Sequence, residues 1–121
     1  MENFKELENF ITKLPGARTL VGKGHAEDGL WWIKFSFDID HPLAWRVVQE
    51  LGHVINYLSL NERLPAVFYP ISPPPYINGG PDEFLSWIIE SKDKDFSPKL
   101  LFEWLEGRFP NPVDNPAEWE V

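Results

Sequence analysis

Two short segments combine carboxylate and imidazole side chains at spacings that could bind a metal ion. Glu50 and His53 are three residues apart, which places both side chains on one face of a helix. Metal sites of this kind need several such pairs converging in a bundle core, whereas this sequence holds one pair, on a polar helix face. Asp38 and Asp40, with His41 adjacent, could bind a hard cation. A structural interpretation is simpler, because Asp40 is suited to cap a following helix and Asp38 to face outward from a strand.

Other chemistry is disfavoured by what the sequence lacks. It has no cysteine, which removes thiolate catalysis and Cys-ligated metal sites. Neither a phosphate-binding glycine loop nor a Gly-x-Ser-x-Gly nucleophile elbow occurs. We therefore predict no catalytic, cofactor-binding or metal-binding residues, and we expect a protein that is not an enzyme.

The chain of 121 residues is acidic, with a formal net charge of −8, and the acid is concentrated in its second half. Residues 66–121 hold ten acidic and four basic side chains, whereas residues 1–65 hold nine and seven. This charge repels nucleic-acid backbones and anionic membrane surfaces and favours a basic protein partner. No apolar run approaches the roughly 20 residues that span a bilayer, and the absence of cysteine favours a cytoplasmic location.

Hydrophobic periodicity predicts a helix and a hairpin at the start of the chain. Residues 2–14 read as a short amphipathic helix. Residues 19–25 and 30–39 are two extended runs on either side of an Asp-Gly turn signal. The second run alternates, so that Trp31 and every second residue after it face the core while Trp32 faces outward.

A longer amphipathic helix is predicted over residues 40–59, with Asp40 as its cap. Its apolar side chains fall within a broad stripe that should be buried. Gly52 lies at the edge of that stripe, and a glycine inside a helix indicates close approach of another segment to its backbone.

The second half of the chain predicts two strands and a helix. The strands cover residues 66–72 and 84–91, and Pro70 makes the first of them an edge or bulged strand because proline cannot donate to a sheet ladder. A helix follows over residues 98–106, with Ser97 at its start.

The order helix, strand, strand, helix, strand, strand, helix predicts an α+β fold. We expect one mainly antiparallel sheet of about four strands with the helices packed on one face. Residues 1–108 should form a single compact domain, and residues 109–121 a proline-rich, acidic C-terminal arm that is either laid across the domain or free.

Residues 69–84 are rich in proline and glycine and connect the two later strands. Residues 73–76 spell the PPxY pattern that WW domains bind. Because the pattern lies between strands of a compact domain, a rigid connecting loop is the simpler interpretation. A loop that itself contacts a partner, for example through Tyr76, is favoured over the linear motif.

Strand alternation also predicts aromatic and aliphatic side chains on the outer face of the sheet. Trp32, Phe84 and Ile88 should face outward, and Phe68 joins them if its neighbours Val67 and Tyr69 point inward. Monomers seldom leave such a surface exposed. It is therefore either an interface or is covered by the arm folding back through its aromatic and aliphatic residues, which are Phe109, Val113 and Trp119.

The sequence as a whole favours a small acidic protein-binding module. We expect an inhibitor or immunity-type protein that binds and neutralises a basic partner such as a toxin. The alternatives are a dimeric secretion-type chaperone, which would be a homodimer, and an enzyme with an Asp/His metal site. The candidate partner-binding residues are Trp32, Phe68, Tyr76, Asp82, Glu83, Phe84, Ile88 and Glu90.

Overall fold

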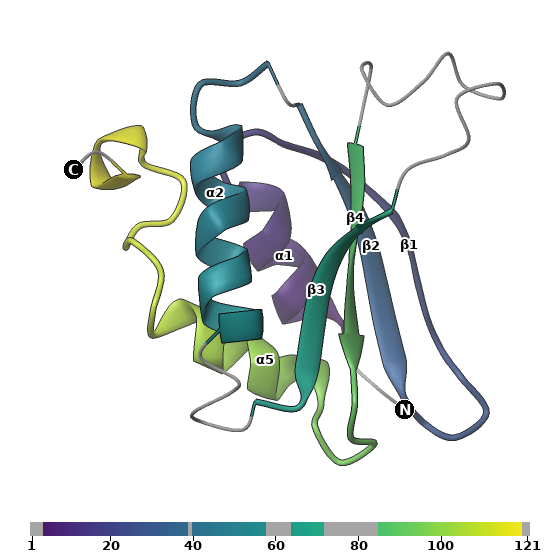
Figure 1. Ribbon diagram of the computed structural model, residues 1–121. Coiled ribbons are helices and arrows are strands. Elements are labelled where there is room, and N and C mark those ends of the chain that lie inside the picture. The colour runs from purple at the N-terminus through teal and green to yellow at the C-terminus, as the bar shows by residue number, and fades with distance from the viewer. Residues whose placement is uncertain (1–3, 39, 58–63, 72–84, 120–121) are drawn as a thin grey trace, which may run out of the picture.

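The computed structural model of the chain describes residues 4–38, 40–57, 64–71 and 85–119. It is an α+β fold with one open antiparallel sheet, as predicted (Figure 1). The sheet has four strands in the order β1-β2-β4-β3. Their bounds are β1 Ala17–His25, β2 Trp31–Phe37, β3 Ala66–Ile71 and β4 Leu85–Ser91.

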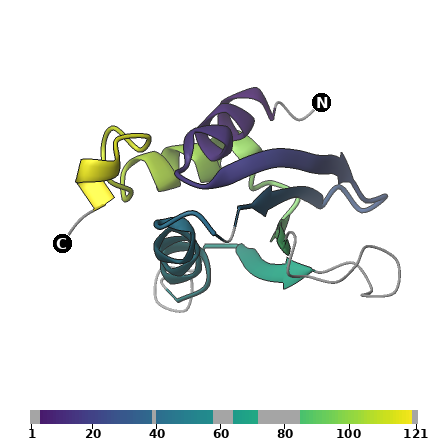
Figure 2. The same cartoon turned by 90° about the horizontal axis from the view of Figure 1, so that it is seen from above.

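The described helices all lie on one side of the sheet, so the core forms between the helical layer and one sheet face (Figure 2). Strand β2 presents Trp31, Ile33, Phe35 and Phe37 to this core, and all four are buried, as the alternation predicts. The helical elements are α1 Lys5–Lys13, α2 Ala44–Leu51, the π-helix η1 Gly52–Tyr57, α5 Pro98–Glu106 and the 3-10 helix η2 Pro116–Trp119.

Strand β3 is an edge strand, which agrees with the prediction made from Pro70. On the free edge of β3, the side chain of Asn56 in η1 pairs with the backbone of Phe68. The Asn56 amide donates to the carbonyl of Phe68 at 2.6 Å and accepts from the Phe68 N–H at 2.8 Å. A side chain that satisfies both groups removes a template on which another strand could pair.

The second helix begins later than predicted, at Ala44, and Asp40 does not cap it. The residue before the helix, Leu43, makes no side-chain capping bond. Instead, Asp38 accepts from the backbone N–H of Asp40 at 3.0 Å, and Nδ1 of His41 accepts from the N–H of Leu43 at 3.0 Å. These side chains therefore stabilise a turn between β2 and α2, which corrects the expectation that Asp40 is a cap.

The predicted helix also changes halfway from α-helical to π-helical hydrogen bonding. The α-helix α2 ends at Leu51 and the π-helix η1 begins at Gly52. Apart from its chain neighbours and the backbone of its own helix, no atom of the described residues lies within 4 Å of the position that a Cβ on Gly52 would occupy. The expectation of close backbone approach at Gly52 is therefore wrong. The glycine marks the point at which the hydrogen-bond ladder widens, after which Val54 and Ile55 are both buried.

The C-terminal arm packs against the helical layer as far as Trp119 and contributes to the same core (Figure 1). The ring of Phe109 lies edge-on to Phe10, with centroids 5.5 Å apart, and to Trp119 at 5.7 Å. Nη1 of Arg46 donates to the carbonyl of Trp119 at 2.6 Å, which ties the arm to α2. The arm thus lies on the side of the molecule away from the outer face of the sheet.

Candidate functional site

Two surfaces can be compared as candidate binding sites, and the first is the outer face of the sheet. Strand pairing aligns Trp32 with Glu90 and Lys34 with Ile88, and Ile88 in turn with Tyr69. The described side of the sheet away from the helices consists of Gly22, Gly24, Trp32, Lys34, Ser36, Val67, Tyr69, Ile71, Ser86, Ile88 and Glu90.

Trp32 faces outward as predicted, but its ring has a role within the sheet. It covers the backbone of Gly22 and Gly24 on the edge strand β1, and a Cβ on Gly24 would lie 2.8 Å from Cζ2 of the ring. Nζ of Lys34 lies 4.9 Å from the ring centroid on the same face. An aromatic ring laid over strand glycines protects their hydrogen bonds from water. The orientation of Trp32 is therefore explained without a partner.

Phe68 and Ile88 are less accessible than the sequence suggests. Phe68 is on the core face, with 4% of its surface exposed, and stacks on Phe35 and Trp87 with ring centroids 6.1 and 5.0 Å apart. The expectation that Phe68 joins the outer face is therefore corrected, because the register of β3 turns Tyr69 outward instead. Ile88 does face outward, yet only 5% of its surface is exposed.

Glu90 contributes to the outer face through a hydrogen bond with Tyr69. The Tyr69 hydroxyl donates to Oε1 of Glu90 at 2.5 Å, and 40% of the Tyr69 surface is exposed. This hydrogen bond raises the pKa of Tyr69 above its ordinary value of 10.0, and partial burial and the Glu90 charge act in the same direction. The other predicted partner-binding residues lie outside the described part of the chain, and they are Tyr76, Asp82, Glu83 and Phe84.

The described outer face therefore offers little that selects a basic partner. Among the outer-face residues named above, the charged ones are Lys34 and Glu90, and Glu90 already accepts a hydrogen bond. Its largest aromatic ring, that of Trp32, packs over the backbone of Gly22 and Gly24. Acidic side chains that would face a basic partner therefore have to be sought on another part of the surface.

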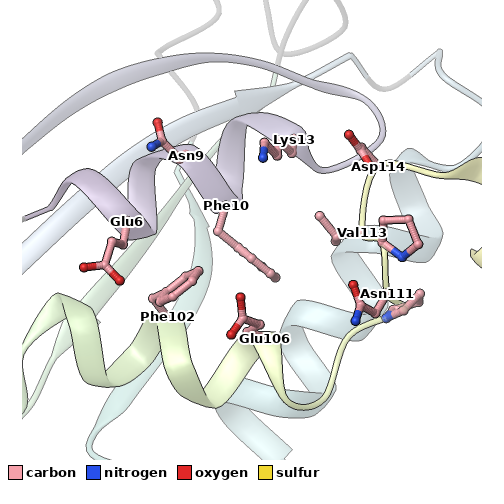
Figure 3. A pocket seen from close by; sticks show the side chains of 11 residues that line it. Glu6, Asn9, Phe10, Lys13, Phe102, Glu106, Asn111, Val113 and Asp114 are labelled. Atoms are coloured by element: carbon pink, nitrogen blue, oxygen red, sulfur yellow. The ribbon is translucent and has the colours of Figure 1, made fainter.

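The second surface is a cavity of about 290 Å³ between α1, α5 and the arm. We call it the acidic hollow. Figure 3 shows Phe10 and Phe102 between the two helices and the carboxylates of Glu6, Glu106 and Asp114 at separate points around the cavity. The residues that line it are Glu6, Asn9, Phe10, Lys13, Phe102, Glu106, Pro110, Asn111, Pro112, Val113 and Asp114.

Helix geometry explains how these side chains come together. Glu6 and Phe10 are four residues apart on α1, and Phe102 and Glu106 are four apart on α5, so each helix presents one aromatic and one acid on the same face. The helices meet through the two rings, which are edge-on with centroids 6.0 Å apart. Each helix therefore places one carboxylate and one aromatic ring on the side that lines the cavity.

The third wall of the hollow is the arm, whose position is fixed at its end. Nε1 of Trp119 donates to the carbonyl of Val113 at 2.8 Å, which folds the arm back on itself. Asp114 follows Val113 directly and adds the third carboxylate.

The charges of the hollow are not neutralised by neighbours. Within the described ranges, Glu6, Glu106 and Asp114 form no ion pair, and the only basic residue that lines the cavity is Lys13. Glu8, two residues after Glu6, does pair with Lys23 of β1. The cavity thus combines a net negative charge, from three carboxylates and one ammonium, with an apolar floor formed by Phe10 and Phe102.

The metal-binding alternatives receive no geometric support from the part of the chain that is described. Its His, Asp and Glu side chains form no group of three that could hold a metal ion. The imidazole of His53 stacks on Tyr57, with ring centroids 5.3 Å apart. His41, as described above, accepts a backbone hydrogen bond.

Sequence reasoning missed the acidic hollow altogether. The signal present in the sequence is a pair of aromatic and acidic residues four positions apart, once in each terminal helix. The spacing within each helix does not predict that α1 and α5 pack against each other. Their contact is a tertiary feature, and it creates the cavity.

Comparison with protein-family models, with curated proteins and with solved structures finds no match to this chain. Among the residues that are described, no helix has both the length and the apolar character needed to cross a membrane. Function therefore has to be inferred from the geometry of the chain itself.

Proposed function

We propose that this chain is a small acidic protein-binding module of the inhibitor or immunity type, which binds and neutralises a basic partner protein such as a toxin. The observation that carries the proposal is the acidic hollow. Its three carboxylates have no ion-pair partner among the described residues, and they surround an aromatic floor. The absence of cysteine fits a cytoplasmic location for such a module.

Electrostatics supports a basic partner in two ways. The net charge of −8 attracts a cationic protein from a distance and raises the rate of encounter. At contact, a cation that enters the hollow gains interactions with three carboxylates that form no ion pair among the described residues. Aromatic floors such as Phe10 and Phe102 are typical anchors of protein interfaces.

The proposal can be tested by affinity capture followed by kinetics. The bait is the wild-type chain, a Glu106→Gln, Asp114→Asn double variant, or the control Glu103→Gln. Glu103 is exposed on the same helix but does not line the hollow. We expect a basic protein that is captured by the wild type and by the control and is lost by the double variant.

The association rate of the captured partner gives the second readout. An electrostatically steered complex should lose about tenfold in association rate when ionic strength is raised from low to high salt. A salt-insensitive rate, or equal capture by the double variant, would contradict the proposal.

A further inference from the structure

We infer that the acidic hollow receives the side chain of an arginine presented by the partner protein. This inference rests on the proposed function and adds the chemistry of the contact. Four features of the cavity point to this occupant, namely its size, its floor, the spread of its charges and its amide groups.

The size of the cavity suits one long side chain. Its volume of about 290 Å³ lies at the lower limit of ligand pockets, which span roughly 300–1,000 Å³. This volume accommodates a single inserted side chain, and the cavity stays open to solvent because Asn9, Lys13 and Asn111 of its lining are exposed. The opening between two helices and the arm lets a segment of a partner lie across the surface while one side chain enters.

The floor favours a planar cation with an apolar stem. Phe10 is almost fully buried and Phe102 half-buried, and their rings meet edge-on at 6.0 Å. The half-buried ring of Phe102 is the more accessible of the two, and a guanidinium stacks on an aromatic ring better than an ammonium does. The methylene stem of an arginine would cover the apolar surface of Val113.

The spread of the carboxylates distinguishes arginine from a metal ion and from lysine. Glu6, Glu106 and Asp114 come from α1, α5 and the arm, and they stand at separate points around the cavity (Figure 3). They do not form a cluster that could hold a metal ion in the described structure. A guanidinium has five donors directed outward from one plane, so it can reach several acceptors at once, whereas an ammonium is a point charge.

The remaining polar residues are compatible with this occupant. Asn9 and Asn111 also line the cavity, and their amide oxygens can accept from N–H groups that the carboxylates do not reach. Lys13 opposes a cation, but three carboxylates against one ammonium leave the rim negative. Lys13 also disfavours the entry of a second cationic side chain beside the first.

The direct test is an NMR titration of the full chain with Nα-acetyl-arginine amide, which presents the side chain without free termini. We expect saturable shifts of amide resonances around Phe10 and Phe102. The neutral isostere Nα-acetyl-citrulline amide and the shorter-reach cation Nα-acetyl-lysine amide should each bind about two- to fivefold more weakly, or worse. Saturable binding of the arginine probe elsewhere on the surface, or the absence of saturable shifts, would overturn the inference.

Variants locate the contact. Glu106→Gln should weaken binding of the arginine probe about two- to fivefold, because it removes one solvent-exposed ion pair. Glu103→Gln on the same helix should change it little, which controls for net charge. Phe102→Leu keeps apolar volume and removes a ring, and it should weaken the arginine probe about two- to fivefold while leaving the lysine probe less affected. Variants are compared only where spectra away from the hollow are unchanged.

The outcomes separate this inference from the proposed function. Equal affinity for the arginine and lysine probes would refute the arginine inference, while salt-dependent capture of a basic partner would still support the binding module. Much tighter binding of free L-arginine than of the blocked probe would refute it too, because the hollow would then be a small-molecule site. Loss of partner capture in all tests would refute the proposed function itself.

Discussion

The C-terminal arm forms one wall of the acidic hollow, so removing the tryptophan that anchors it tests the site and the fold together. Trp119 is 4% exposed, lies edge-on to Phe109, and donates from Nε1 to the carbonyl of Val113. The substitution Trp119→Ala deletes all of these side-chain contacts. It leaves the hydrogen bond from the Arg46 guanidinium to the backbone carbonyl of residue 119 possible.

The expected loss in free energy of unfolding follows from the burial of Trp119. Replacing a buried tryptophan by alanine costs about 3–5 kcal/mol in free energy of unfolding, and that range includes a hydrogen bond of about 1 kcal/mol. The arm packs on the core without joining the sheet, so it can undock locally, which limits the cost to the free energy of docking. We therefore expect a loss of about 3 kcal/mol, at the lower end of the range.

Urea unfolding followed by far-ultraviolet circular dichroism measures this loss, and Trp45→Ala is the matched control. Trp45 is 51% exposed, and its ring lies edge-on to that of Trp87 with centroids 6.4 Å apart. Its removal should cost about 1 kcal/mol. Trp119→Ala should also abolish saturable binding of the arginine probe, since the arm wall is lost, whereas Trp45→Ala should retain it. If the two variants are destabilised equally, to within about 0.5 kcal/mol, the docked arm is refuted.

Two further predictions concern the outer face of the sheet. Gly24→Ala places a Cβ 2.8 Å from the ring of Trp32, so the ring must move, and we expect a loss of about 1 kcal/mol in urea unfolding; unchanged or higher stability would show that Trp32 does not rest on the glycine. An ultraviolet absorbance titration should show Tyr69 ionising at higher pH in the wild type than in Glu90→Ala. Because the folded-state pKa of Tyr69 is raised, its contribution to stability is present below the unfolded pKa near 10 and is lost as pH rises through the folded value. Identical titrations would contradict the role given to Glu90.

Much of the fold could be predicted because its elements carry strong periodic signals. The alternation from Trp31 to Phe37 places large apolar residues on one side, which fixes the core face of β2. Pro70 indicates an edge strand, since it lacks the N–H that an inner strand needs. Ser97 has the side chain that a helix start requires, and it accepts from the N–H of Leu100 at 3.2 Å.

Two of the predictions that were wrong, for Asp40 and Phe68, involve residues for which the local sequence allows two placements. Asp40 suits a helix cap as well as a turn, and here its N–H is bound in a turn by the Asp38 side chain. The helix starts only at Ala44, so the cap position falls on Leu43 and not on Asp40. Val67, Phe68 and Tyr69 are three apolar-compatible residues in succession, so alternation alone does not say which of them faces inward. The pairing of β3 with β4 decides it, and register is a property of two segments together.

The acidic hollow shows why net charge is a weak guide to function until the chain is folded. Glu6 and Glu8 are both in the first turn of α1 and look equivalent in the sequence. Two residues along a helix turn the side chain by about 200°, so Glu8 reaches Lys23 of β1 while Glu6 faces the cavity beside α5. One glutamate is thus neutralised within the fold and the other remains available to a cation. A partner is selected by carboxylates such as Glu6 that have no ion pair within the fold. The packing of α1 between β1 and α5 determines which glutamate is paired and which is not.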